Sequence, residues 1–201
     1  MKRTWLVAAV AAFGCATVKE NPRTAAGAGG GAATGAVVGG VLGGGKGAAV
    51  GGVIGGAVGG VAGHILDKQA AELKQKDINA SRTANGILVK LKEDLLFDIG
   101  SDSLKPQALD ELNSLGDVLA KYPQDRIQIL GFTDSTGSEE FNDELSKKRA
   151  EAVRKVLVSR GLGEQQAVAI GMGEQNPIAP NDTAAGRSKN RRVELHIAVA
   201  K

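Results

Sequence analysis

The sequence predicts an α+β domain after residue 86, a sandwich in which the helices lie on one face of a mixed sheet. Short segments with alternating apolar residues indicate strands, and two longer segments with apolar residues three or four apart indicate helices. Glycine content separates this domain from the preceding chain, because 18 of the 29 glycines lie between Gly27 and Gly63. The predicted order, β-α-β-α-β-β, is typical of helices packed against one side of a sheet.

Start and stop signals mark the two helices of this domain. The first has Pro106 in its first turn, where the missing N–H costs nothing. The second begins after Ser138, a suitable N-cap, and ends at Gly161. The predicted helices cover residues 105–121 and 138–161, and the predicted strands residues 86–91, 126–132, 167–173 and 191–199. Residues 176–190, "NPIAPNDTAAGRSKN", are predicted as a loop.

The N-terminus has the pattern of a secretory signal. Lys2 and Arg3 precede nine apolar residues, Trp5 to Phe13, a run too short to span a bilayer, and the only cysteine, Cys15, follows. A lone cysteine at this point resembles the signal of bacterial lipoproteins, in which the chain is cut before the cysteine and its thiol is acylated. That resemblance implies lipidation of Cys15 and, with alanine at position 16, delivery to the outer membrane. An ordinary cleaved signal with an incidental thiol is the alternative.

Ten glycines occupy every fourth position from Gly27 to Gly63. The residues between them are mostly apolar, and Lys46 is the only charged one. In a water-exposed helix each glycine costs about 1 kcal/mol relative to alanine, whereas in lipid small residues at this spacing let two helices approach closely. Residues 27–63 therefore resemble a glycine zipper, with a hairpin turn at "GGGKG", that associates with a membrane and with itself. A disordered tether is the alternative.

The next segment, "HILDKQAAELKQKDINA", is predicted as an amphipathic helix of mixed charge. We interpret it as a solvated spacer between the glycine repeat and the domain. The predicted organisation is a signal over residues 1–14, a lipidated segment over 15–26, the zipper over 27–63, a helical linker over 64–85 and the domain over 86–201.

Composition and motifs argue against nucleic-acid binding and catalysis. Residues 86–201 carry 16 basic and 18 acidic side chains, which is not the balance of a nucleic-acid surface. His196 falls inside the last predicted strand, where a structural histidine is expected. Without metal-ligand clusters, a Ser/His pairing or carboxylates at a hydrolase spacing, we expect no enzyme and no cofactor.

One cation interrupts the apolar row of the second predicted helix. The row contains Phe141, Leu145, Val153 and Leu157, and Arg149 occupies the helical step between the second and third of them. An arginine there must reach solvent or meet an anion. Three arrangements remain open from the spacing alone: a solvated edge position, an ion pair with an acid such as Asp134, or a bound ligand that carries a carboxylate.

Three long segments of the domain resemble the OmpA-like peptidoglycan-binding domain, which also occurs in peptidoglycan-associated lipoproteins and flagellar stator proteins. They are "LLFDIGSDSLKPQALDELN", "GFTDSTGSEEFNDELSKKRAEAVRKVLVSRG" and "GMGEQNPIAPNDTAAGRSKNRRVEL". In this family the Asp of "TDxxG" and the Arg of "LSxxRA" grip the diaminopimelate residue of the peptide stem, and the matching residues are Asp134 and Arg149. The resemblance implies further site residues: Asn142, Thr136, Phe97, Asp98, Asn190, Arg191 and Arg192. Phe132 stands where the family usually has histidine.

The resemblance implies a non-enzymatic outer-membrane lipoprotein. Its domain would face the periplasm, bind the meso-diaminopimelate stem of peptidoglycan and tether the outer membrane to the cell wall. A carboxylate matches the ammonium of diaminopimelate, and a guanidinium matches its carboxylate through two parallel N–H bonds. The alternative is an oligomeric membrane or assembly factor that acts through the glycine zipper and is positioned by wall binding.

Overall fold

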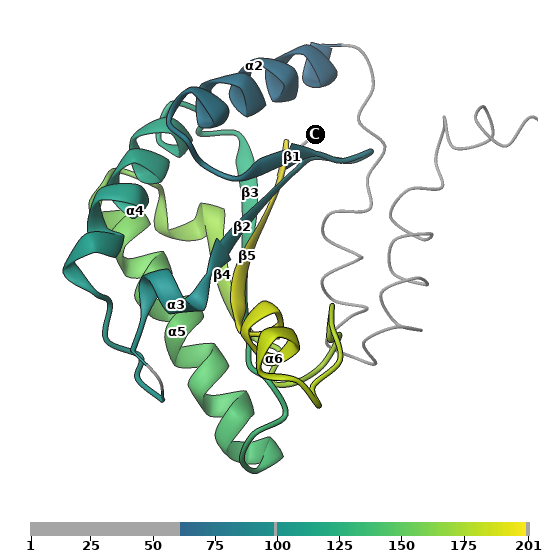
Figure 1. The fold of residues 1–201 in the computed structure, drawn as a ribbon. Helices are drawn as coiled ribbons and strands as arrows, with labels where there is room; N and C mark the ends of the chain where they lie inside the picture. Colours follow the sequence, from purple (N-terminus) through teal and green to yellow (C-terminus); the bar gives the residue numbers. More distant parts are fainter. Residues whose placement is uncertain (1–60, 99, 200–201) are drawn as a thin grey trace, which may run out of the picture.

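The computed structural model describes residues 61–98 and 100–199, which form an α+β fold around one five-stranded mixed sheet (Figure 1). The strands are β1 (Ala80–Arg82), β2 (Ile87–Lys92), β3 (Asp125–Phe132), β4 (Ala167–Gly171) and β5 (Arg192–Val199). Their order in the sheet is β1-β2-β5-β3-β4. Only β3 and β4 pair in parallel; the other neighbours are antiparallel.

Two long helices, α4 (Pro106–Leu119) and α5 (Glu139–Ser159), lie on one side of the sheet (Figure 1). Their apolar rows form one core with the inward side chains of the strands, including Leu112, Leu115, Val153, Leu157 and Ile129, all fully buried. The predicted start signals are confirmed, because Pro106 opens α4 and the Ser138 hydroxyl accepts a hydrogen bond from the Phe141 amide. The predicted fold class, helices on one face of a mixed sheet, is confirmed.

The helix that precedes the domain is not a solvated spacer. Helix α2 (Val61–Gln75) buries Leu66 and Leu73 completely in the same core as α4 and α5. The Gln69 amide also donates to the buried carboxylate of Asp125, with Nε2 and Oδ2 2.7 Å apart. The prediction of a spacer is therefore wrong: the apolar residues of this amphipathic segment cover the core, and the chain continues from them directly into β1.

Four short elements were not predicted. They are β1 (Ala80–Arg82), α3 (Glu93–Leu96), the 3-10 turn η1 (Glu164–Gln166) and α6 (Ala184–Asn190). Helix α6 lies in the segment predicted as a loop, although Thr183 caps it by accepting from the Gly186 amide. A threonine followed by two alanines is a usable start signal, but the segment is too short to show apolar periodicity.

Two features predicted from the sequence lie outside the described residues. These are the lipidation site at Cys15 and most of the glycine zipper, residues 27–60. In the described part of the chain, no helix is long and apolar enough to cross a membrane.

Candidate functional site

An open cavity of about 380 Å³ lies where β2, β3 and β5 meet helix α5. Its wall combines both signs of charge with apolar and amide groups. The charged residues are Arg149, Arg187, Arg191, Glu93 and Asp134, and Phe141, Leu145 and Asn142 are among the others. The structure therefore brings the two principal residues of the predicted site, Asp134 and Arg149, to the same cavity, although 15 positions separate them in the sequence.

Strand register places the central cation of this cavity. Lys92 of β2 and Phe132 of β3 both pair with Arg192, the first residue of β5. Because β5 lies between β2 and β3, the residue before it, Arg191, lies between the chain that leaves β2 and the chain that leaves β3. Arg191 thus faces acids from two separate strand ends.

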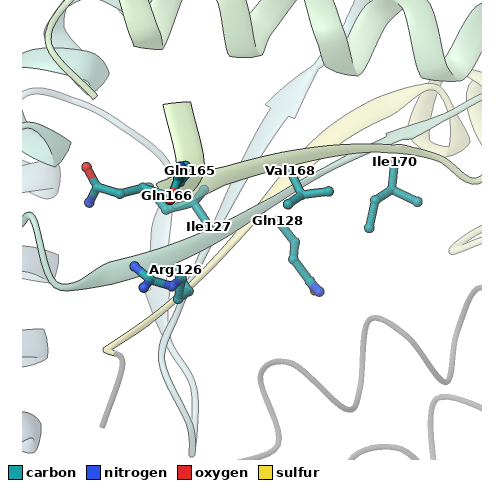
Figure 2. Close-up of a pocket in the computed structure, with 7 residues that line it drawn as sticks. All are labelled: Arg126, Ile127, Gln128, Gln165, Gln166, Val168 and Ile170. Carbon is teal, nitrogen blue, oxygen red and sulfur yellow. The ribbon is translucent and has the colours of Figure 1, made fainter. Parts of the chain in front are cut away.

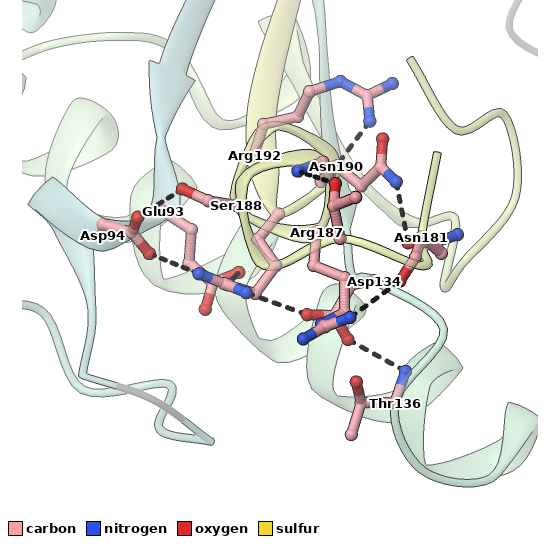
Figure 3. A network of polar contacts seen from close by, with 12 residues as sticks. Glu93, Asp94, Asp134, Thr136, Asn181, Arg187, Ser188, Asn190 and Arg192 are labelled. Atoms are coloured by element: carbon pink, nitrogen blue, oxygen red, sulfur yellow. Dashed lines mark hydrogen bonds and ion pairs between the residues drawn. The ribbon is translucent and has the colours of Figure 1, made fainter. Parts of the chain in front are cut away.

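Arg191 bridges three carboxylates. Its Nη1 lies 2.9 Å from Oδ2 of Asp134, and its Nη2 lies 2.9 Å from Oδ1 of Asp94 (Figure 3). On the inner side, its Nε lies 3.7 Å from Oε2 of Glu93. Burial alone would lower the pKa of Arg191, but the hydrogen bonds that its guanidinium donates to Asp134 and Asp94 outweigh that effect and raise it. The guanidinium is therefore charged at every physiological pH.

Arg149 is held in the cavity wall by an ion pair that the sequence did not reveal. Its side chain is only 2% exposed, and its Nη2 lies 2.6 Å from Oε1 of Glu93, which is 3% exposed. Its Nε donates to the backbone carbonyl of Ser101 at 2.8 Å, and its guanidinium carbon lies 5.3 Å from the centre of the Phe97 ring. The structure thus supports the second of the three arrangements considered for this arginine, an ion pair with an acid, but the acid is Glu93 and not Asp134.

The two acids of the cavity have opposite net pKa shifts. For Glu93, burial raises the pKa to about 7 in spite of the nearby Arg149 and Arg191. Burial also acts to raise the pKa of Asp134, but hydrogen bonds from Arg191 and from Thr136 more than offset it, and the net shift is downward. Asp134 is therefore a carboxylate at neutral pH, whereas Glu93 is close to its titration midpoint.

The loop after β3 fixes the orientation of Asp134. Its Oδ1 accepts from the Thr136 amide at 2.9 Å (Figure 3). Its backbone carbonyl accepts from Nδ2 of Asn142 at 3.3 Å. Helix α5 comes so close to β3 here that a Cβ on Gly131 would collide with the carbonyl oxygen of Ser146. Glycine at this position allows the close approach. Thr136 and Asn142, both predicted from the resemblance, lie in the cavity wall.

Four residues of the predicted site lie outside the cavity wall. Phe97 is buried in the core beside Arg149, and Asp98 is exposed and pairs with Lys105. Asn190 accepts from the amides of residues 178 and 179, so it holds the preceding loop. Arg192 points away from Asp134 (Figure 3), because neighbouring residues at the start of a strand project to opposite faces. Their roles in ligand contact stay predictions. The contacts that they make in the structure join each of them to other residues of the protein.

The sequence did not single out several residues that line the cavity. Glu93 and Arg187 had no helical or strand periodicity to mark them, because each lies in a short element. Phe141 was assigned to the apolar row of the helix, yet it is 54% exposed and lines the cavity. Phe132, in place of the usual histidine, is 3% exposed and packs with Leu130 and Met172. It is not part of the cavity wall.

A second cavity, of about 210 Å³, lies along β3 and β4 (Figure 2). Val168, Ile170 and the amides of Gln128 and Gln166 line it, and Arg126 is its one charged residue. It offers no pair of opposite charges to a polar ligand. In residues 61–98 and 100–199, no cluster of three or more His, Cys, Asp or Glu side chains is arranged to hold a metal ion.

The cavity, lined by side chains of both charges, lies at the strand ends of a helix-covered mixed sheet in a small α+β domain. Residues 96–191 match the OmpA family. Residues 1–67 match the YMGG-like Gly-zipper family. Both resemblances predicted from the sequence are thereby confirmed.

Two curated relatives and one solved structure illustrate the similarity. "Probable lipoprotein YiaD" of Escherichia coli K12 is 35% identical over 139 residues, which are 67% of this chain and 64% of that protein. "Peptidoglycan-binding protein ArfA" of Mycobacterium tuberculosis H37Rv is 46% identical over 101 residues, 50% of this chain and 31% of that protein. The structure of a MotB-like protein from Desulfovibrio vulgaris superposes with a TM-score of 0.61 at 25% identity, covering 69% of this chain and 93% of the other. The chain therefore spans less than two thirds of the curated relatives.

Proposed function

We propose that this protein binds the meso-diaminopimelate residue of peptidoglycan stem peptides and tethers the outer membrane to the cell wall without catalysis. The observation that carries the proposal is that Asp134, Asn142 and Arg149 line one open cavity. Diaminopimelate ends in an ammonium and a carboxylate on one carbon, so it needs an acid and a base side by side.

Asp134 is suited to receive the ammonium group. Its pKa is lowered, so it is ionised at neutral pH, and one of its oxygens already points toward Arg191. A carboxylate has about four acceptor positions, and the contacts with Arg191 and Thr136 use two of them. The remaining lone pairs are available to a ligand ammonium.

Arg149 is suited to receive the carboxylate. Its Nη2 lies close to Glu93 but donates no hydrogen bond within the described part of the chain, and the residue borders the cavity. A planar guanidinium can hold a carboxylate through parallel N–H bonds, which lysine cannot do. Charge-assisted bonds of this kind contribute about 1.5 to 3 kcal/mol each, so the affinity of one site is modest. Many copies on a polymeric wall would make the attachment strong.

The membrane end of the tether rests on the sequence and on the relatives. Cys15 follows a lipoprotein-type signal, one relative carries the name of a probable lipoprotein, and another that of a peptidoglycan-binding protein. We propose that acyl chains on Cys15 anchor the protein in the outer membrane, with the glycine zipper at the membrane and the domain in the periplasm.

Sedimentation with purified peptidoglycan tests the wall contact. We expect the protein to sediment with diaminopimelate-type wall and to stay in solution with lysine-type wall, which lacks the second amino-acid centre. Arg149→Lys and Asp134→Ala should each lose at least about ten-fold in affinity, the equivalent of one charge-assisted bond. Arg160→Lys is the matched control, because Arg160 forms an exposed pair with Asp117 outside the cavity. Equal sedimentation of all variants would remove Asp134 and Arg149 from the site.

The match of residues 1–67 to the YMGG-like Gly-zipper family supports a second candidate function, an oligomeric membrane or assembly factor. In that case the zipper assembles the protein, and wall binding only positions it. Chemical crosslinking distinguishes the two: a discrete oligomer that disappears when Gly51, Gly55 and Gly59 are changed to leucine would favour assembly.

A further inference from the structure

Glu93 has no part in the proposed grip on the ligand, yet it is the most buried acid of the cavity wall. Its side chain is 3% exposed, and its Oε1 lies 2.6 Å from Nη2 of Arg149. Its second oxygen, Oε2, has no hydrogen-bond partner among the described residues and lies 3.7 Å from Nε of Arg191. A buried carboxylate with an unsatisfied oxygen is costly unless a ligand or a proton completes it.

The charged groups that face Glu93 come from every element around it. Arg149 belongs to α5, Arg191 lies just before β5, and Asp134 lies in the loop after β3. Asp94 is its neighbour on α3, and Asp102, in the loop that follows, acts on Arg149. Two guanidiniums favour the ionised form of Glu93, and two nearby carboxylates oppose it. One additional anion would therefore favour protonation of Glu93.

The proposed ligand brings that anion. A carboxylate that reaches Arg149 would lie near the same guanidinium as the Glu93 carboxylate, in a wall with little solvent. Two carboxylates that share one site do not both stay ionised at low cost, and one of them takes up a proton. The ligand carboxylate is the more exposed of the two and remains charged; Glu93 is the one that is buried.

We propose that Glu93 is a positioning residue that holds Arg149 in the wall of the empty cavity and takes up one proton from solvent when the ligand carboxylate binds. The inference rests on the proposed function and adds a regulatory property to the same site. Once protonated, Oε2 becomes a hydroxyl that can donate to the ligand carboxylate, while Oε1 stays beside Nη2 of Arg149. Binding is therefore linked to pH.

The resting ionisation of Glu93 supports this linkage. Its pKa of about 7 leaves the group partly ionised at neutral pH, and a nearby anion raises that pKa further. Above pH 7, binding must protonate Glu93, so affinity falls by up to about ten-fold per pH unit. Below pH 7 the group is already protonated in the free protein, and its contribution to the pH dependence vanishes.

Titration calorimetry of the full-length protein in detergent with a soluble meso-diaminopimelate tripeptide tests the proposal. Measurements at pH 6 to 8.5, in buffers with different ionisation enthalpies, give both the dissociation constant and the number of protons taken up. For the wild type we expect between about one half and one proton per ligand at pH 8, and close to none at pH 6. Glu93→Gln keeps a neutral oxygen beside Arg149, as protonated Glu93 does, so it should bind as the wild type does at pH 6 and show no uptake at pH 8.

Glu164→Gln, an exposed glutamate outside the cavity, is the matched control and should behave as the wild type at both pH values. Proton uptake that persists in Glu93→Gln, or a wild-type affinity that is constant from pH 7 to 8.5, would overturn the role of Glu93 and leave the ligand assignment intact. If the tripeptide does not bind the wild type at any pH, the proposed function itself is overturned. The wild-type proton count needs no variant, so the test holds even if Glu93→Gln fails to fold.

Discussion

Arg191 and Arg192 are adjacent in the sequence but belong to two charge clusters with opposite properties. Arg191 borders the cavity and bridges Asp134, Asp94 and the side of Glu93. Arg192 is 6% exposed and lies on the other side of the sheet, with its guanidinium carbon 3.7 Å from the centre of the Phe132 ring. Their different surroundings distinguish a cluster that is internally hydrogen-bonded from one that forms the candidate site.

The cluster of Arg192 is internally complete. Its Nε donates to Glu194 at 2.8 Å, and the second carboxylate oxygen of Glu194 lies 2.9 Å from Nε2 of His196. Burial acts to raise the pKa of Glu194, but the bonds from His196 and Arg192 overcome it and bring that pKa down to about 2. No side-chain atom of Arg192 or Glu194 is left buried without a hydrogen bond in the described part of the chain.

The cavity cluster, formed by Glu93, Arg149 and Arg191, contains buried side-chain atoms that lack hydrogen bonds. Oε2 of Glu93, Nη2 of Arg149 and Nε of Arg191 are all buried without a hydrogen bond among the described residues, and the pKa of Glu93 is raised to about 7. Burial thus acts to raise the pKa of both glutamates, but the net shift is downward for Glu194, which is fully hydrogen-bonded, and upward for Glu93, which is not. A buried charge cluster that lacks partners beside an open cavity is a candidate binding site; a completed one is a structural feature.

The largest effect on stability should follow from breaking the complete cluster. Glu194→Ala leaves Arg192 buried without its partner, so we expect the free energy of unfolding to fall by about 3 to 5 kcal/mol. Urea denaturation followed by circular dichroism measures it. Peptidoglycan sedimentation below the unfolding transition should be unchanged, and a loss of binding in the folded variant would contradict the separation of the two clusters.

Lowering the pH should remove the stabilisation that Glu194 provides in the Arg192 cluster. Because the folded-state pKa of Glu194 is depressed to about 2, its contribution to stability is fully present above the unfolded-state value near 4.5 and is lost as the pH falls toward 2. We expect a loss of about 3 kcal/mol from this group over that range. In Glu194→Gln the corresponding slope should be absent from unfolding curves measured at several pH values; an equal slope in both proteins would assign the acid sensitivity to other groups.

The cavity cluster should respond to pH in the opposite sense. The pKa of Glu93 is raised, so its contribution is fully present below the unfolded-state value near 4.5 and is lost as the pH rises through 7. Between pH 4.5 and 8 the stability of Glu93→Gln relative to the wild type should therefore improve by about 3 kcal/mol. Thermal unfolding of both proteins at these two pH values checks the sign, and a relative loss for the variant would show that the ion pair dominates over burial.

An exposed ion pair should contribute least to the free energy of unfolding. Arg160 and Asp117 pair on the surface, with side chains 42% and 51% exposed. Asp117→Ala should change the free energy of unfolding by no more than about 0.5 kcal/mol, because solvent screens such pairs. A change as large as that of Glu194→Ala would mean that burial does not separate the clusters.

Long elements with a clear period could be predicted from the sequence. Helices α4 and α5 and strands β3 and β5 were all found within a few residues of their observed bounds, since each is long enough for its apolar residues to repeat. Helix α6 was missed because seven residues show no period. The apolar residues of α2 were seen, but a sequence does not say what an amphipathic helix packs against.

The candidate site was only partly predictable for a related reason. Asp134 and Arg149 could be named through the resemblance, and the position of Arg149 in an apolar row had marked it as unusual. The acid that pairs with it, Glu93, follows the last residue of β2 and becomes a neighbour only through the register of β2 with β5. Spacing along one helix carries no information about such a pairing.

The packing of helix α2 determines how a mechanical load reaches the domain. Leu66 and Leu73 fasten this helix to the core, and Glu72 receives contacts from Lys121 and the Tyr122 hydroxyl. Tension that arrives from the N-terminal side would meet a docked helix before it meets any strand. In the proposed tether, α2 would then undock from the core under force before the sheet and the cavity unfold.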